Sequence, residues 1–176
     1  MVELPKFKYH PDPIGTGAIE ASEEVCECCG KATGYIYSSI IYADEEIEFI
    51  CPWCIADGSA AKKFDGTFID NYPLLNAGLS EEIISEVCER NPGYNSWQQE
   101  QWQSHCNDAC EFHGDAKKED LQALSGVELE SFLTKEMIKP DFWENILAAY
   151  QKGGSPAVYQ FKCRKCPKVI YTMDFD

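Results

Sequence analysis

Four pairs of closely spaced cysteines are the residues of this chain with the clearest capacity for chemistry. The chain has 176 residues and ten cysteines. Two sulfurs separated by two or three residues can hold one metal ion from a tight turn, and two such turns complete a tetrahedral site. The spacing therefore predicts two structural zinc ions, each bound by two pairs. The pairs are Cys26/Cys29, Cys51/Cys54, Cys106/Cys110 and Cys163/Cys166.

The first and second pairs are predicted to form one site. They are separated by 21 residues, which is close to the interval of a zinc ribbon. The segments 35–42 and 47–50 between them are rich in β-branched and aromatic residues, and a polar turn joins the two segments. This pattern predicts a β-hairpin that brings the second cysteine turn back beside the first.

The third and fourth pairs are predicted to form the second site. Sequential pairing closes shorter loops than a cross-braced arrangement in which the first turn pairs with the third, so we favour it. His105 and His113 flank the third pair, and either could replace a cysteine as a ligand. The exact ligand set of this site stays open at the level of sequence.

Two cysteines lie outside the pairs, and one pair has a rival interpretation. Cys28 is expected to be a spare thiol, with a role as an alternative ligand left open, and Cys88 is expected to be a small buried apolar residue. The run Cys51-Pro52-Trp53-Cys54 is also typical of dithiol oxidoreductases. That chemistry is usually found within a βαβ unit, and no such unit surrounds this motif. Metal binding is therefore the preferred interpretation.

The elements around the cysteines predict an α+β fold. Helices are expected at 55–63, 80–90, 120–124, 128–133 and 141–151, and strands at 158–162 and 169–172 on either side of the last cysteine turn. We expect a zinc-ribbon-like hairpin module over 1–78, and a helical region over 79–176 closed by a hairpin that carries the last cysteine pair. The two regions are expected to pack as one unit.

Charge and composition limit the function classes. Thirty acidic and 15 basic residues give a formal charge of −15, which disfavours nucleic acid as a partner. The sequence has neither a secretory signal nor an apolar run long enough to span a membrane, so we expect a cytoplasmic protein with reduced thiols. Three histidines and closed cysteine sites offer little for acid–base or metal catalysis, and we expect no enzyme.

Several runs of residues match a known family pattern. They are residues 4–13, 26–30, 51–61 and 161–166, together with His105, Cys106 and Cys110. In these runs the chain resembles the CbrC family, a small bacterial family named for a member linked to tolerance of a DNase colicin. The resemblance implies a protective, non-enzymatic role against a nuclease toxin and supplies no catalytic residues.

The charge gives this implied role a physical basis. Nuclease toxins present basic grooves to nucleic acid, and an acidic protein can approach such a groove under electrostatic steering. The candidate partner-binding residues are Asp44, Glu45, Glu46 and Glu48. We therefore expect an immunity or tolerance protein that binds a basic toxin domain. A zinc-ribbon adaptor in regulation or nucleic-acid metabolism is the alternative, and it would use the basic turn at 162–168.

Overall fold

The computed structural model describes residues 3–176 and has a mixed α+β architecture with three small antiparallel sheets. The strands are β1 (Ile19–Ala21), β2 (Tyr35–Tyr37), β3 (Ser104–His105), β4 (Asp108–Ala109), β5 (Glu111–Asp115), β6 (Ala157–Lys162) and β7 (Val169–Asp174). The helices are α1 (Pro52–Ala56), α2 (Ser59–Phe64), α3 (Tyr72–Asn76), α4 (Glu81–Glu89), α5 (Lys118–Gln122), α6 (Gly126–Lys135) and α7 (Pro140–Ala149). The predicted α+β class is confirmed at this coarse level.

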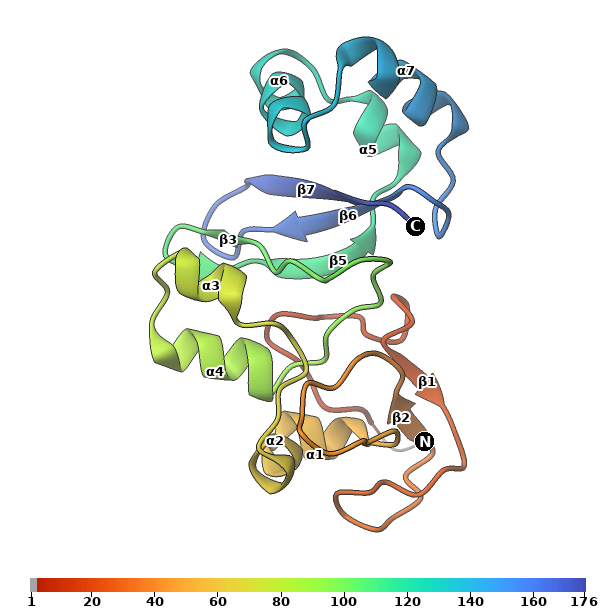
Figure 1. Ribbon diagram of the computed structural model, residues 1–176, viewed down its shortest axis with the longest axis vertical. Helices are drawn as coiled ribbons and strands as arrows, with labels where there is room; N and C mark the ends of the chain where they lie inside the picture. Colours follow the sequence, from red (N-terminus) through yellow and green to blue (C-terminus); the bar gives the residue numbers. More distant parts are fainter. Residues whose placement is uncertain (1–2) are drawn as a thin grey trace.

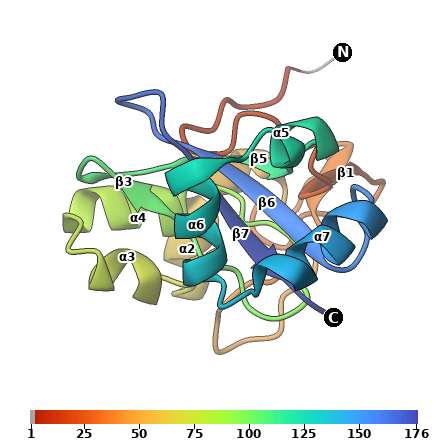
Figure 2. The same ribbon diagram turned by 90° about the horizontal axis from the view of Figure 1, so that it is seen from above.

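The three-stranded sheet of β5, β6 and β7 is the centre of the molecule, with β6 in the middle (Figure 1). Helices α5, α6 and α7 cover one face of this sheet, and the view from above shows them lying across β6 and β7 (Figure 2). The side chains of β6 alternate between the two faces, as the pleat of a strand requires. Val158 packs under the helices, whereas Tyr159 and Phe161 pack on the opposite side.

Three apolar cores follow from this arrangement, and we name them by position. The helical core lies between α5–α7 and the sheet and includes Leu121, Phe132, Trp143, Ile146 and Val158. The central core lies on the other face of the sheet and includes Tyr9, Leu74, Val87, Trp102, Cys110, Phe112 and Phe161. The N-terminal core includes Phe7, Ile19, Tyr37, Ile50, Ile55 and three cysteines of the first two pairs.

The local signals for the helices and for the C-terminal hairpin are confirmed. Ser80 caps α4 by accepting a hydrogen bond from the backbone N–H of Ile83 at 3.4 Å, and Pro140 stands in the first turn of α7, where its missing N–H costs nothing. Strands β6 and β7 pair over their full length on either side of the last cysteine turn. The helix expected at 55–63 is present as two short helices, α1 and α2.

The expected hairpin between the first two cysteine pairs is only partly present. Strand β2 pairs with the earlier strand β1, from Ile19↔Tyr37 to Ala21↔Tyr35. The second half of the expected hairpin contributes a single bridge, in which the N–H of Tyr37 donates to the carbonyl of Ile50 at 2.8 Å. This bridge is enough to bring the second cysteine turn beside the first. The sequence prediction was wrong about the main partner of β2, because a partner earlier in the chain gives no local signal.

The central core draws residues from both sides of the predicted boundary at 78/79. Leu74 and Val87, from α3 and α4, pack in it together with Tyr9 near the N-terminus. The backbone of Tyr9 also pairs with the sheet region, since its carbonyl accepts from the N–H of Phe112 at 2.8 Å. The N-terminal segment therefore connects the first cysteine module to the sheet that carries the second.

Candidate metal centres

The first two cysteine pairs lie together, as their spacing predicts. The sulfurs of Cys26, Cys29, Cys51 and Cys54 all lie within 4.8 Å of one another, and we call this group the N-terminal cluster. Cys51 directly precedes α1 and Cys54 lies one turn into it, so the helix sets the direction of both side chains. Pro52 occupies the first helical position, where its fixed φ favours the helix start.

The first turn of this cluster is closed by backbone hydrogen bonds. The N–H of Cys26 donates to the carbonyl of Lys31 at 3.0 Å, and the N–H of Gly30 donates to the carbonyl of Cys26 at 2.7 Å. Gly30 has a φ of 70°, a conformation that glycine adopts without strain. Lys63 holds the turn from outside, because its ammonium donates to the carbonyls of Glu27 and Cys28 at 2.7 and 3.1 Å.

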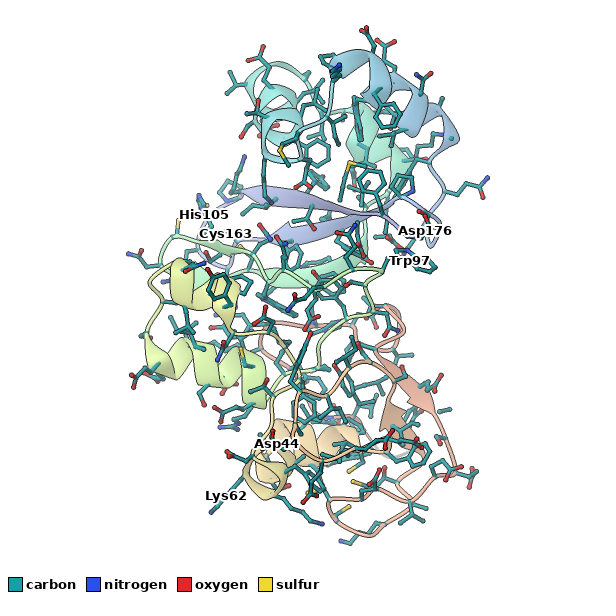
Figure 3. All side chains as sticks on the ribbon, viewed as in Figure 1. Asp44, Lys62, Trp97, His105, Cys163 and Asp176 are labelled. Atoms are coloured by element: carbon teal, nitrogen blue, oxygen red, sulfur yellow. The ribbon has the colours of Figure 1, made fainter. Side chains whose placement is uncertain are left out.

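The second cluster combines a histidine with three cysteines. His105, Cys106, Cys163 and Cys166 place one ligand atom each within 4.8 Å of the others, and we call this group the C-terminal cluster. Nδ1 of His105 lies 3.2 Å from the sulfur of Cys106 and 3.5 Å from that of Cys166. In Figure 3, His105 and Cys163 lie together at one end of the sheet.

Cys110 is a correction to the predicted ligand set. Strands β3 and β4 form a tight hairpin whose two turn residues, Cys106 and Asn107, have φ values of 53° and 52°, the pattern of a two-residue type I′ turn. The turn places Cys106 at its tip beside His105. Cys110 follows the returning strand and is fully buried in the central core, where its carbonyl accepts a 2.9 Å bond from the indole N–H of Trp102.

The sequence contains a signal for this hairpin turn, which the cysteine spacing alone does not reveal. Asn107 is a residue that tolerates positive φ, and with it a two-residue hairpin at 106–107 becomes the natural turn. In such a hairpin Cys110, four residues after Cys106, no longer lies at the tip. The other open alternative, His113, lies outside the cluster with its Nε2 3.3 Å from the carboxylate of Glu111.

The remaining cysteines lie where the sequence predicts them. Cys88 is buried in the central core, and burial raises the pKa of its thiol to about 12, so it stays protonated and apolar. Cys28 lies beside the N-terminal cluster without joining it, and its sulfur is 3.6 Å from the hydroxyl of Ser59. The pairing of the turns is sequential, as predicted, and not cross-braced.

Both sets of donor atoms fit a tetrahedral ion. An ion held at about 2.3 Å from each sulfur, as Zn²⁺ is, places two sulfurs about 3.8 Å apart. The sulfurs of Cys29 and Cys51 are 3.9 Å apart, and so are those of Cys106 and Cys166. The two clusters can therefore hold two metal ions.

Each cluster contains one thiol whose surroundings favour the thiolate. Burial by itself would raise the pKa of Cys26, but the backbone N–H groups of Cys51, Cys29 and Cys28 lower it below its usual value. Burial likewise opposes ionisation of Cys163, yet the N–H of Lys165 and the side chain of His105 bring its pKa to about 6. A thiolate that is already stabilised is the form that binds a metal.

The neighbouring cysteines have raised pKa values. Burial, and then the nearby Cys26, raise the pKa of Cys51 to about 11, and burial raises that of Cys54 further. At Cys106, loss of solvation and then the neighbouring Cys166 and Cys163 raise the pKa to about 11. Loss of solvation is the largest cause of these raised pKa values, and neighbouring thiolates add to it, because like charges at contact distance repel one another. A bound cation would remove that repulsion.

Two of the four basic residues in the turn at the C-terminal cluster, Arg164 and Lys165, are paired with acidic residues. Arg164 lies 3.4 Å from carboxylate oxygens of both Asp108 and Glu111. The ammonium of Lys165 lies 3.9 Å from Asp108 and donates to the carbonyls of Cys106 and Asn107. These contacts hold the two turns of the cluster together and reduce the positive potential that the sequence places here.

The predicted partner-binding residues lie on the surface of the N-terminal region. Asp44, Glu45, Glu46 and Glu48 are all exposed in the segment before α1. Figure 3 shows Asp44 in the part of the molecule that lies far from His105 and Cys163. No helix among residues 3–176 is both long and apolar enough to cross a membrane.

Comparison with known proteins gives a family match over almost the whole chain. The model of an uncharacterised protein family, UPF0167, matches residues 4–175. A UPF0167 protein of Pseudomonas aeruginosa is 47% identical over 174 residues, covering 98% of this chain and 97% of that protein. UPF0167 proteins of Mycobacterium bovis and Mycobacterium tuberculosis are each 38% identical over 176 residues, covering 98% of this chain and 94% of theirs. No solved structure matches.

Proposed function

This chain belongs to the uncharacterised protein family UPF0167, and from its two clusters we propose that it is a non-enzymatic zinc protein that acts by binding a basic protein partner. The observation that carries the proposal is the completeness of the clusters. Each brings four ligand atoms together, so a tetrahedral ion has no position left for water or substrate. Such an ion stabilises a fold and does not activate a reactant.

The donor types select the metal. Thiolate and imidazole ligands favour zinc over magnesium and calcium, which prefer oxygen, and a tetrahedral set of sulfur and nitrogen is typical of structural zinc. The ligands of the first ion are Cys26, Cys29, Cys51 and Cys54. Those of the second are His105, Cys106, Cys163 and Cys166.

Bound zinc makes the protein more acidic. With ionised thiols, the N-terminal cluster contributes −2 and the C-terminal cluster −1, which takes the formal charge from −15 to about −18. A surface of this sign attracts basic protein domains over a Debye length of about 8 Å at physiological ionic strength. The resemblance to the CbrC family supports a basic nuclease toxin as the partner, and an immunity or tolerance role for this chain.

The alternative of a nucleic-acid adaptor has weaker support. Two of the four basic residues in the turn that would contact phosphate are already paired, Arg164 with Asp108 and Glu111 and Lys165 with Asp108. Phosphate would have to displace those carboxylates while approaching a strongly acidic protein. We therefore favour a protein partner.

Metal analysis of the purified chain tests the first part of the proposal. The expected result is two zinc ions per chain, with extended X-ray absorption showing an average of 3.5 sulfurs and 0.5 nitrogen per zinc, because the two sites together supply seven sulfurs and one nitrogen. Iron in place of zinc, or fewer than two ions in protein that is folded, would contradict it.

A binding assay with a catalytically inactive nuclease toxin domain tests the second part. The association rate should fall steeply with added salt, because charge steers the encounter. Replacing Asp44, Glu45 and Glu46 by lysine should slow association if this segment faces the toxin. The matched control makes the same charge change elsewhere, at Glu128, Glu130 and Glu144 of α6 and α7. If both sets of substitutions slow association equally, overall charge and not the segment at 44–46 controls the encounter. The absence of any complex would refute direct binding.

A further inference from the structure

A cavity of about 320 Å³ lies at the end of the sheet opposite to the C-terminal cluster. Its walls come from β5, the start of β6, the segment around Trp97, the turn at 152–154, and Gly15 and Thr16 near the N-terminus. Figure 3 shows the separation, with Trp97 at one end of the sheet and His105 and Cys163 at the other. The metal clusters and the acidic segment at 44–48 do not contribute to this cavity.

Two residues that line this cavity each carry a buried polar atom that lacks a hydrogen-bond partner. These atoms are Oγ of Ser96 and Oδ1 of Asp115, and among the residues described they are the two buried side-chain oxygen or nitrogen atoms with this property. The other oxygen of Asp115 is satisfied, because it accepts from the N–H of Gly153 at 2.9 Å. Buried polar groups in folded proteins are almost always paired, so an unpaired carboxylate oxygen and an unpaired hydroxyl beside one cavity favour a ligand with hydrogen-bond donors.

A β-bulge brings Asp115 into this position. The register of β5 against β6 changes between Phe112↔Phe161 and Asp115↔Tyr159, so one extra residue is inserted in β5. Gly114 takes up the irregularity with a φ of 77°, and a side chain there would press on Thr16, whose Cγ2 would lie 3.0 Å from the added carbon. Bulges redirect side chains and occur often beside binding sites.

The rest of the cavity is aromatic and firmly held. Tyr94, Phe112 and Tyr159 are buried at its base, and Trp97 is 57% exposed at its rim. The segment that carries Ser96 and Trp97 is fixed from behind, since the carboxylate of Asp174 accepts hydrogen bonds from the N–H groups of Trp97 and Gln98. The backbone beside the cavity is therefore held in place before any ligand arrives.

We propose that this cavity binds a primary ammonium group, with Asp115 and Ser96 as hydrogen-bond acceptors and the aromatic side chains around the attached carbon chain. An ammonium has three donors and no acceptor, which matches two unpaired acceptors, and a cation is attracted to aromatic faces. An anion would be repelled by the carboxylate. The proposal is independent of the metal clusters and of the partner proposed above.

The protein environment supports a cationic ligand. Burial raises the pKa of Asp115, which means that the unliganded site leaves its charge poorly compensated. Lys152 on the rim lowers this pKa by its charge, but among residues 3–176 it forms no ion pair with Asp115. A ligand ammonium inside the cavity would supply that pairing.

The same chemistry can come from a free amine or from a lysine of another protein, and calorimetric titration of the zinc-loaded chain separates them. The probes are 2-phenylethylamine, its neutral analogue 2-phenylethanol, and Nα-acetyl-lysine amide. We expect at least one of the two amines to bind and the alcohol to bind at least tenfold more weakly, because it lacks the charge. A preference for phenylethylamine would indicate a small-molecule site, and a preference for the lysine derivative would indicate a partner's side chain.

Two variants and one control complete the test. Asp115→Asn keeps the shape and the bond from Gly153 and should weaken amine binding roughly tenfold or more, and Ser96→Ala should weaken it about fivefold. Glu144→Gln removes the same charge from the exposed face of α7 and should change nothing. Circular dichroism confirms that each variant is folded. Failure of both amines to bind, equal binding of the alcohol, or unchanged binding in folded Asp115→Asn would overturn the proposal.

Discussion

The two clusters share one kind of turn and differ in the other. In the N-terminal cluster the N–H of Cys26 bonds to the carbonyl five residues on, at 3.0 Å, and in the C-terminal cluster Cys163 does the same at 2.9 Å. A lysine holds each cluster by donating to two backbone carbonyls, Lys63 in one and Lys165 in the other. The other half of the N-terminal cluster is the start of a helix, and the other half of the C-terminal cluster is a two-residue hairpin.

Their burial differs, and with it their place in the fold. Cys26, Cys51 and Cys54 are part of the N-terminal core and fill space there that apolar side chains would otherwise occupy. Cys106 is exposed at the end of a sheet whose own core contains packed aromatic residues such as Tyr94, Phe112 and Phe161. The comparison indicates that an ion in the N-terminal cluster would replace missing apolar packing, whereas an ion in the C-terminal cluster would fasten two turns on a sheet that is stabilised by other contacts.

Substitution of one cysteine in each cluster tests this difference, and it carries the largest expected effect. Cys26→Ser should lose one zinc and unfold the N-terminal region, since structural zinc contributes on the order of 10 kcal/mol to small modules. Cys106→Ser should also lose one zinc but keep a folded sheet. Zinc content and near-ultraviolet circular dichroism measure both outcomes.

The control for this comparison is Cys88→Ser, the same change at a buried thiol outside both clusters. It should keep two zinc ions and lose only the stability associated with a hydroxyl in an apolar core. If Cys106→Ser unfolds the chain as completely as Cys26→Ser does, the proposed difference between the clusters is wrong.

The presence of His105 in the C-terminal cluster in place of Cys110 predicts the next largest effect. His105→Ala should lose one zinc, whereas Cys110→Ala should keep both, because Cys110 lies in the core and His105 belongs to the cluster. Cys110→Ala should still lower the free energy of unfolding by about 1–2 kcal/mol, because the sulfur no longer fills its place in the core. Metal analysis of the two variants is decisive: loss of zinc from Cys110→Ala together with retention in His105→Ala would restore the ligand set predicted from spacing.

Chelation should distinguish the clusters by rate. Removal of zinc by a chelator requires access to the ligands, and the C-terminal cluster exposes Cys106 while three sulfurs of the N-terminal cluster are buried. We expect the first zinc to leave the C-terminal cluster, with alkylation of Cys106 and Cys166 preceding that of Cys51 and Cys54 in mass spectra. Simultaneous release, or the reverse order, would show that local burial does not control access.

The two lysines should give the smallest effects. Lys63→Met and Lys165→Met each remove hydrogen bonds to two backbone carbonyls, and each should lower the free energy of unfolding by about 1 kcal/mol. Urea unfolding measures this, with an unchanged slope as the sign that only stability has altered. Lys162→Met, next to Cys163, removes the same charge and serves as the control. An equal loss in the control would assign the effect to charge and not to the turns.

Local signals in the sequence determined much of this fold. The cysteine spacing located seven of the eight residues that the structure gathers into clusters, because two sulfurs in one turn are brought together by the turn itself. Ser80 and Pro140 marked the starts of α4 and α7, since capping depends on neighbouring residues alone. The β6–β7 hairpin followed from two apolar strands on either side of a short turn.

The tertiary structure decided the ligand set of the C-terminal cluster, the partner of β2 and the cavity, because these features depend on contacts between residues that are distant in the sequence. His105 replaced Cys110 through the position of one hairpin turn, and in a strand a shift of one residue turns a side chain to the opposite face. The partner of β2 proved to be β1, which no signal near β2 could indicate. The cavity around Asp115 forms where a bulge in β5 meets Gly15 and Thr16, the segment before β3 and the turn before β6, so four separate parts of the chain must fold together to enclose it.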